Sequence, residues 1–543
     1  MIKNLDPNLF TLFLITTFVL YVFYFDEIKL SNFISSKTSI QYKNDLSQKT
    51  NLVVIFFIQF VFVVLYQGQY LSYETIDSDI HTYLLVGNDV LNGNLPYENE
   101  WDDKGPLLYI IYSVLIFISN KNLVIFKILC DVIVLIIAFL IANISLIINK
   151  TNKISHALFN SILFITLLSQ PWGSAEYSEI FALLFLSLSI FIFLKHQNNL
   201  GFVFASGIAF GITTLTNQGS GVFLFLFLLL IYQSKKLAHL NLFILGISIP
   251  HVIMLGLYAS RNLLDIYFST LFFIPINYSS QRFDFVYEFS VYLRETLYFD
   301  PFLYSIIILL FVISIFKLIQ FKNLSFYEFI PYIGIFLSLI FFFLGSTGYK
   351  HHLIFFLFFL SLIPPSLNRS KKSFRWIFVL FILFSFLFFG NKSIHKSLYN
   401  FYNLEEIYAN YPLRQLAQEI ENEFENDFNI FALDHTLVLF YLNLENEGYI
   451  IHPTNYLEPS IINQLIKVEK IQENELSFQI SQKPNVVICS QEIRSLIEEV
   501  NCEVTDFYKG YRKINTDKYF ENNYRTYYDD PYRTIDLYIN NQK

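Results

Sequence analysis

The chain has 543 residues, of which 54% are hydrophobic, 19% are aromatic and only 15% are charged, and its mean hydropathy is +0.45. Soluble domains carry about 25% charged residues, so this composition excludes a soluble protein and indicates a multi-pass membrane protein. The net charge of −8 does not set its orientation, because the placement of charge across a membrane matters more than its sum. Membrane lipids are therefore expected partners, and nucleic acid is not.

A membrane-spanning helix needs about 20 mostly apolar residues. The first candidate, Leu9 to Phe25, lacks a basic segment before it and a small-residue cleavage site, so we expect an uncleaved anchor. Residues 1–50 are interpreted as this anchor helix and a cytoplasmic loop. Twelve segments meet or approach the required length: 8–24, 51–70, 122–148, 155–170, 179–194, 202–216, 219–232, 239–258, 301–319, 327–345, 351–366 and 376–390.

A thirteenth apolar run, Pro106 to Ser119, is only about 14 residues long, and positive charge decides whether it crosses. If it does not cross, the loops on one side hold most of the lysine and arginine that lies between the spans, whereas the short loops opposite hold only Lys104, Lys121 and Lys350. The run is therefore predicted to be a juxtamembrane helix at the interface. Four segments then lie on the extracytoplasmic side: 71–121, 170–179, 260–300 and the chain after 390.

The tail, 391–543, differs in composition from the rest of the chain. Helix-like amphipathic stretches, Leu413 to Phe424 and Gln491 to Val500, alternate with short apolar runs at 429–433 and 485–489. This alternation predicts a small extracytoplasmic α/β domain. The predicted fold is thus an all-α polytopic membrane region of about twelve spans with a small α/β domain at its C-terminal end.

The chain has three cysteines, too few for a zinc cluster or a disulfide framework. Cys130 lies in an apolar span. Cys489 and Cys502 lie in the polar tail, where they could pair outside the cytoplasm or remain two free thiols.

An acidic stretch follows the second span: Asp77-Ser-Asp79-Ile-His-Thr-Tyr83, leading on to Trp101-Asp102-Asp103-Lys104-Gly105-Pro106. Ionised groups resist leaving water, so carboxylates and a lysine crowded against a membrane face indicate a site. Asp79 could accept a proton from a hydroxyl or orient it, Lys104 could neutralise a phosphate, and Asp103 could bind a divalent cation. The alternative is a solvated acidic loop whose Lys104 reaches a lipid headgroup.

This loop resembles the first extracytoplasmic loop of bacterial GT-C glycosyltransferases, which are related to protein O-mannosyltransferases and the lipid A aminoarabinose transferase. The resemblance covers roughly residues 51–390, interpreted as a transmembrane catalytic domain. It implies that Asp79 is the catalytic or acceptor-orienting group, and that Asp103 and Lys104 bind metal and lipid-linked phosphate. The matching residues are Asp79-x3-Tyr83-x3-Gly87, Leu91-x-Gly93-x2-Pro96-Tyr97 and Trp101-Asp102-x-Lys104-Gly105-Pro106.

Two further elements match the family. Glu179, at the start of a span, matches an acidic residue of the family, although a helix N-terminus favours an acid without any catalytic role. In Tyr349-Lys350-His351-His352, adjacent helical side chains point about 100° apart, so at most one histidine is expected to face the site. The resemblance favours His351. Lys350 and His351 could contact the donor phosphate, or His351 alone could join Asp103 at a metal. Interfacial anchoring by Tyr349 and Lys350 is the alternative.

Other polar groups have simpler interpretations. Lys127 and Asp131, four residues apart in one span, are expected to neutralise each other. Pro250-His251 indicates a helix kink with a satisfied histidine. Any of Arg261, Arg282 and Arg294 could help to hold a phosphate.

The resemblance thus implies an integral glycosyltransferase of the bacterial inner membrane, transferring a hexosyl or pentosyl group from a polyprenyl-phosphate donor to an extracytoplasmic lipid, glycan or protein. The cofactor that the resemblance implies is a divalent metal ion, and no other is expected. Two alternatives stay open. A transporter would place ionisable residues and broken helices near the membrane midplane in related halves, and this chain has few such charges and no repeat. A ligase or polymerase using a lipid pyrophosphate donor would favour arginine-rich outer loops.

Overall fold

The computed structural model describes residues 40–148, 154–234, 237–277, 311–312, 315, 326–344, 349–363, 393–424, 428–490, 511–515 and 535–540. The predicted spans 8–24 and 376–390, most of 301–319, the predicted helix Gln491 to Val500, and Arg282 and Arg294 lie outside these residues.

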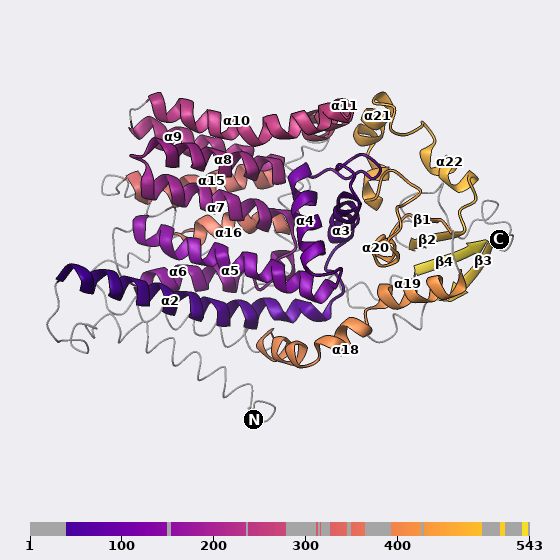
Figure 1. Cartoon of the computed structure of the whole chain (residues 1–543), viewed down its shortest axis with the longest axis horizontal. Helices are drawn as coiled ribbons and strands as arrows, with labels where there is room; N and C mark the ends of the chain where they lie inside the picture. The colour runs from indigo at the N-terminus through magenta and orange to yellow at the C-terminus, as the bar shows by residue number, and fades with distance from the viewer. Residues whose placement is uncertain are drawn as a thin grey trace.

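A bundle of apolar helices forms the larger part of the described chain and runs along the long axis of the molecule (Figure 1). A helix satisfies its own backbone polar groups, which is the condition for crossing a hydrocarbon layer. Among the described residues, four helices are long and apolar enough to cross a membrane: Leu52–Ser72, Leu123–Ile148, Ser178–His196 and Leu237–Ser260. The bundle helices are α2 (Ile40–Gln67), α5 (Leu123–Ile148), α6 (Ile154–Leu167), α7 (Ser178–His196), α8 (Leu200–Thr216), α9 (Leu224–Ser234), α10 (Leu237–Ser260), α15 (Ile330–Leu344) and α16 (Ile354–Ser361).

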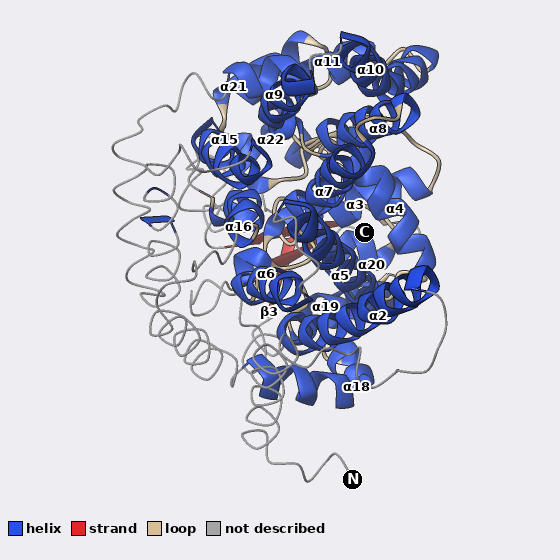
Figure 2. Ribbon diagram, turned by 90° about the vertical axis from the view of Figure 1, so that its left-hand side faces the viewer, coloured by secondary structure: helices blue, strands red, loops and turns tan. Residues whose placement is uncertain are grey.

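Nine of the predicted spans coincide with described helices of the bundle, which Figure 2 shows nearly end-on. The total of twelve spans stays a prediction. Small residues hold α8 against α10: a Cβ on Gly207 would lie 2.2 Å from the carbonyl oxygen of Phe243, and one on Gly246 would lie 2.3 Å from that of Phe204. Such close backbone approach is how helices pack where burial from water supplies no driving force.

Two shorter helices, α3 (Ser78–Leu91) and α4 (Pro106–Ile118), lie across one end of the bundle (Figure 1). Asp77 caps α3 by accepting a hydrogen bond from the backbone N–H of Asp79, and Pro106 occupies the first turn of α4. The two helices pack closely, because a Cβ on Gly87 would lie 2.8 Å from the Cβ of Tyr112. α4 coincides with the helix predicted for 106–119, and its juxtamembrane placement stays a prediction.

The described part of the tail combines helices with a four-stranded sheet of order β1-β2-β4-β3. β1 and β2 are parallel, whereas β4 is antiparallel to both β2 and β3. α19 and the strands β1 and β2 confirm the predicted helix 413–424 and the predicted short apolar elements. The described elements of the tail are α18 (Leu404–Ala409), α19 (Pro412–Glu423), β1 (Ile430–Ala432), α20 (Leu437–Leu442), α21 (Pro459–Lys467), α22 (Glu475–Ser481), β2 (Val486–Ser490), β3 (Tyr511–Asn515) and β4 (Ile535–Asn540).

Cys489, on β2, is disulfide-bonded, and Cys130 is a free, buried thiol. Cys502, the partner that the sequence offers, lies outside the described residues. The boundaries 1–50, 51–390 and 391–543 stay predictions.

The tail is joined to the bundle end by backbone and side-chain hydrogen bonds. The N–H of Trp101 donates to Tyr449 O at 2.7 Å, and the N–H of Ile451 donates back to Trp101 O at 3.2 Å. The buried carboxylate of Glu74 accepts from the N–H groups of Leu413 and Arg414, at 2.8 and 3.0 Å, at the start of α19. Apolar side chains of both parts form one continuous core. These contacts fix the tail over α3.

Glu74→Ala should loosen this junction. The substitution leaves two N–H groups at the start of α19 without their acceptor, and losing a helix cap costs about 0.5–2 kcal/mol. We expect a lower thermal unfolding midpoint and faster proteolysis of the tail in detergent-solubilised protein. Glu406→Ala, at an exposed position of α18, is the matched control and should change neither. Equal behaviour of the two variants would show that Glu74 does not hold the tail.

Candidate active site

The carboxylate of Asp79 lies where three parts of the chain meet. It belongs to the first turn of α3, and its Oδ1 lies 2.9 Å from Nε2 of His452 in the tail. Its Oδ2 accepts a hydrogen bond from the Tyr83 hydroxyl at 3.2 Å and lies 4.0 Å from Nε2 of His351 in the bundle. The side chain is 17% exposed. Asp79 is therefore largely buried but surrounded by groups that favour its ionised form.

The neighbours of Asp79 decide its protonation. Burial alone would raise the pKa of Asp79, but the hydrogen bond from His452 and the charge of Lys104 hold that pKa below its usual range. Burial would lower the pKa of His452, and the bond to Asp79 overcomes it and raises the pKa to about 9. The two side chains therefore form an ion pair at neutral pH. An anion so stabilised is a weak base and a good acceptor of hydrogen bonds.

Lys104 lies beside this carboxylate, just before α4. Its ammonium is 2.8 Å from the Asp103 carboxylate, and its backbone N–H donates to the Tyr109 hydroxyl at 3.2 Å. Burial would lower the pKa of Lys104, but the charges of Asp103 and Asp79 raise it. Gly105 is required next to it, because a Cβ there would lie 2.1 Å from the carbonyl oxygen of Leu215. Lys104 is thus held as a cation.

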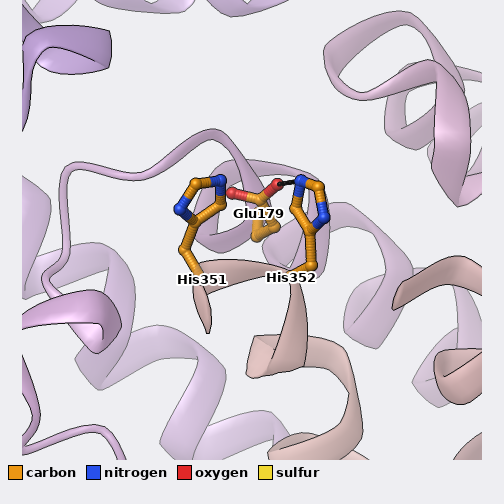
Figure 3. A group of neighbouring side chains, drawn as sticks. All are labelled: Glu179, His351 and His352. Carbon is orange, nitrogen blue, oxygen red and sulfur yellow. Dashed lines mark ion pairs between the residues drawn. The ribbon is translucent and has the colours of Figure 1, made fainter. Parts of the chain in front are cut away.

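Glu179, His351 and His352 form a second cluster, in which the two imidazole rings lie on either side of the carboxylate (Figure 3). Glu179 is fully buried in the first turn of α7; its Oε1 lies 3.6 Å from Nε2 of His352 and accepts from the Asn217 amide at 3.2 Å. One potential ligand atom from each of the three residues lies within 4.8 Å of the others.

Of the two adjacent histidines, His352 lines the cavity of about 580 Å³ that adjoins the site and His351, which the resemblance favours, does not, although both lie close to Glu179. They lie in a 3-10 turn, η9 (Lys350–Leu353), and not in a regular α-helix. Their ring centroids are 4.7 Å apart with the planes at 88°, which brings both rings towards Glu179.

A cavity of about 580 Å³ adjoins the site. Its walls are mostly apolar and come from α8, α10, α15, η5 (Gln218–Phe223) and η6 (Ser269–Phe273). Asp103, Lys104 and His352 supply its main charged or ionisable groups. His251, which also lines it, contacts the Thr214 hydroxyl at 2.9 Å, confirming the prediction of a satisfied histidine. Mostly apolar walls with Lys104 among them suit an apolar molecule with an anionic end.

No protein-family model matches the chain, and no curated protein matches its sequence. Among solved structures, it is similar to ArnT from Cupriavidus metallidurans in the apo state, with a TM-score of 0.52 at 13% sequence identity over 90% of this chain and 98% of that one. The same ArnT bound to undecaprenyl phosphate gives a TM-score of 0.53 at 14% identity over 89% and 97%. The chain has a GT-C-like fold.

Within this GT-C-like fold, the predicted residues fall into neighbouring groups. Asp79 lies within 4.0 Å of His351, and Lys104 is electrostatically coupled to Asp79. Glu179 is next to His351 and His352. Lys350 is partly buried at the start of η9. Their roles in catalysis or binding stay predictions.

Two other groups have partners that differ from those predicted. Asp103 is paired with Lys104 and does not belong to the cluster of potential ligands found among the described residues. Lys127 was expected to pair with Asp131, four residues along the same helix. Its ammonium lies 3.7 Å from the carboxylate of Glu176, in another loop, and donates to Tyr70 O at 3.2 Å. Folding brings together segments that a helical i,i+4 rule cannot relate.

Arg261 has a positioning role for the loop between α3 and α4. Its guanidinium bonds the Glu98 carboxylate at 3.0 and 3.2 Å and the carbonyl oxygen of Gly93 at 3.1 Å. These contacts place Arg261 against the loop and give no evidence for phosphate binding.

Sequence reasoning missed His452, His352 and Asn217. His452 follows a short apolar run in the tail and carries no motif. Its contact with Asp79 spans 373 positions of the chain, since one residue is 79 and the other 452. The only sequence signal was the predicted placement of the tail on the side of the Asp79 loop.

The ion pair of Asp79 and His452 should make stability depend on pH. Folding raises the pKa of His452 to about 9. The ion pair therefore adds its full share to the free energy of unfolding below pH 6.5, the ordinary pKa of histidine being about 6.5, and that share is lost as the pH rises through about 9. The contribution is on the order of 3 kcal/mol. Thermal unfolding should show a gap between wild type and His452→Gln that narrows over this range.

His395→Gln, at an exposed position, is the control and should follow wild type at each pH. A gap between wild type and His452→Gln that stays constant from pH 6 to 10 would contradict the ion pair.

Proposed function

We propose that the protein is an integral membrane glycosyltransferase that moves a sugar from a polyprenyl-phosphate donor to an acceptor at the extracytoplasmic face. The observation that carries this proposal is the apolar cavity of about 580 Å³ with Lys104 at its wall. Lys104 is coupled to the ionised Asp79. The GT-C-like fold supports it, since one of the structurally similar proteins is ArnT bound to undecaprenyl phosphate.

The donor would lie with its prenyl chain along the apolar walls and its phosphate near Lys104. The leaving group in this transfer is the prenyl phosphate, whose negative charge grows as the sugar departs. A lysine held as a cation in a site of low dielectric stabilises such charge more strongly than it could in water. Lys350 and His351 are proposed to assist in binding the phosphate.

Asp79 would orient the acceptor hydroxyl towards the anomeric carbon of the sugar. Its lowered pKa makes it a weak base in the resting site, so its first task is to hold the hydroxyl in line by a strong charge-assisted hydrogen bond. The proton could pass to Asp79 as the hydroxyl attacks and becomes acidic. Attack from the face opposite the phosphate would invert the anomeric configuration.

Glu179, His351 and His352 fit a divalent cation. Two imidazole nitrogens and one carboxylate form the His₂Glu ligand set that zinc uses when a position is left for another ligand. A cation held there would supply positive charge near the phosphate end of the cavity. Asp103, paired with Lys104, is the less suitable ligand.

The proposed location is the bacterial plasma membrane, with the site and tail outside the cytoplasm. The distribution of lysine and arginine over the loops supports this orientation. The segments that carry Asp79, Glu179 and His452 contact one another at one end of the bundle, as a single reaction site requires.

Asp79→Asn and Lys104→Ala should both suppress sugar transfer from a radiolabelled polyprenyl-phosphate sugar in membranes. We expect kcat to fall about 10²–10⁴-fold for Asp79→Asn and about 10²–10³-fold for Lys104→Ala. The matched controls are Asp265→Asn and Lys467→Ala, at exposed positions of α11 (Leu264–Phe268) and α21. Full activity of Asp79→Asn would exclude Asp79 as the acceptor-orienting group. Lipid transport without any sugar transfer would instead favour a transporter.

The metal proposal predicts about one equivalent of a divalent cation in protein purified without chelators, measured by elemental analysis. Glu179→Gln combined with His352→Gln should abolish this binding. Asp103→Asn, the matched carboxylate change at the cavity wall, should retain it. Metal-free wild-type protein that transfers sugar at full rate would show that the three residues act without a cation.

A further inference from the structure

The tail contributes to the candidate site through His452, a residue without a motif. We propose that His452 is a positioning residue that holds the Asp79 carboxylate for the acceptor, so that the catalytic group is complete only with the tail in place. This inference rests on the proposed glycosyl transfer and assigns the tail a part in it.

Both nitrogens of the His452 ring have polar neighbours. Nε2 lies 2.9 Å from Asp79 Oδ1 and 3.3 Å from the Ser78 hydroxyl. Nδ1 lies 2.9 Å from the Thr454 hydroxyl. A ring bonded at both ends cannot rotate without losing a contact, and a protonated imidazole donates from both nitrogens. Thr454 therefore fixes the ring, and the ring fixes Oδ1.

The backbone that carries His452 is itself anchored to the Asp79 side of the molecule. Ile450 forms a parallel bridge with Trp101, and the indole N–H of Trp101 donates to the Thr270 hydroxyl at 2.8 Å. Pro453 begins the 3-10 turn η10 (Pro453–Leu457) directly after His452. The bridge at Trp101 lies three residues before Lys104. One backbone junction thus brings His452, the partner of Asp79, close to the segment that carries Lys104.

This arrangement distinguishes the two oxygens of Asp79. Oδ1 is occupied by His452 at 2.9 Å. Oδ2 has a longer bond from Tyr83, at 3.2 Å, and faces His351 at 4.0 Å. Oδ2 is therefore the oxygen that can take a hydrogen bond from the hydroxyl of the acceptor substrate, and it lies on the side of His351. His452 would direct this oxygen by holding the other.

A purely structural role for His452 makes different predictions from a positioning role. A structural clasp would lower the yield of folded protein and leave the kcat of the folded fraction unchanged. A positioning residue lowers kcat while the KM for the lipid donor stays constant, because the donor cavity is lined by other residues. It also acts only through Asp79, so its effect should vanish when Asp79 can no longer act.

The test is a double-mutant cycle on purified full-length protein, with kcat, KM and the thermal midpoint measured for each variant. The variants are His452→Ala, His452→Gln, Asp79→Asn and Asp79→Asn with His452→Ala. We expect His452→Ala to lower kcat about 10²-fold with donor KM unchanged, and His452→Gln, which keeps an N–H donor, to recover about tenfold of it. In the Asp79→Asn background, His452→Ala should change kcat less than about twofold. The thermal shifts should be non-additive.

A kcat of His452→Ala within about twofold of wild type, or an equal loss in both backgrounds, would overturn the positioning role and leave the proposed function standing. Absence of transfer by wild type would overturn the proposed function. In that case the thermal midpoints of the variants test the contact by themselves. Non-additive shifts of the midpoint support the coupling of His452 to Asp79, and additive shifts overturn it.

Discussion

A buried carboxylate that must stay ionised is the constraint on which the site depends. Asp79 is 17% exposed, yet its pKa is held below the usual range because His452 and Lys104 offset the cost of burial. Each of these partners needs its own support. Lys104 is balanced by Asp103, and the ring of His452 is fixed by Thr454. Removing any partner leaves a charge in a poorly solvated position, so these side chains form one electrostatic unit.

This unit joins two parts of the chain that are far apart in sequence. The bundle supplies the apolar cavity and the cluster of Glu179, His351 and His352. The helices across its end supply Asp79, and Lys104 precedes the second of them. The tail supplies His452 and is tied down at Trp101 and Glu74. A reaction at this end would thus use a lipid in the bundle and an acceptor approaching past the tail, which agrees with the proposed division between donor and acceptor.

Local patterns in the sequence predicted much of this fold. Long apolar runs such as 122–148 became helices, and the short runs at 429–433 and 485–489 became strands, because burial and backbone hydrogen bonding act over short stretches. The order of residues from Asp79 to Lys104 led to the expectation of a GT-C-like fold, which the similarity to the ArnT structures confirms.

Contacts made only by folding could not be predicted. His452 reaches Asp79 because the tail packs over α3, and no spacing in the sequence encodes that approach. His352 joins Glu179 because the segment forms a 3-10 turn, whose side-chain directions differ from those of the α-helix assumed for it. Lys127 meets Glu176 across a loop. In each case a polar side chain finds its partner through tertiary structure, and a motif search considers only neighbours along the chain.

The most direct test of the account is a cryo-electron microscopy structure of the full-length protein in lipid nanodiscs with a polyprenyl-phosphate sugar. We expect prenyl density along the cavity between α8, α10 and α15, phosphate density beside Lys104, and an intact contact between Asp79 and His452. Phosphate bound at another end of the bundle, or a lipid-filled cavity with Lys104 and Asp79 remote from the sugar, would contradict it.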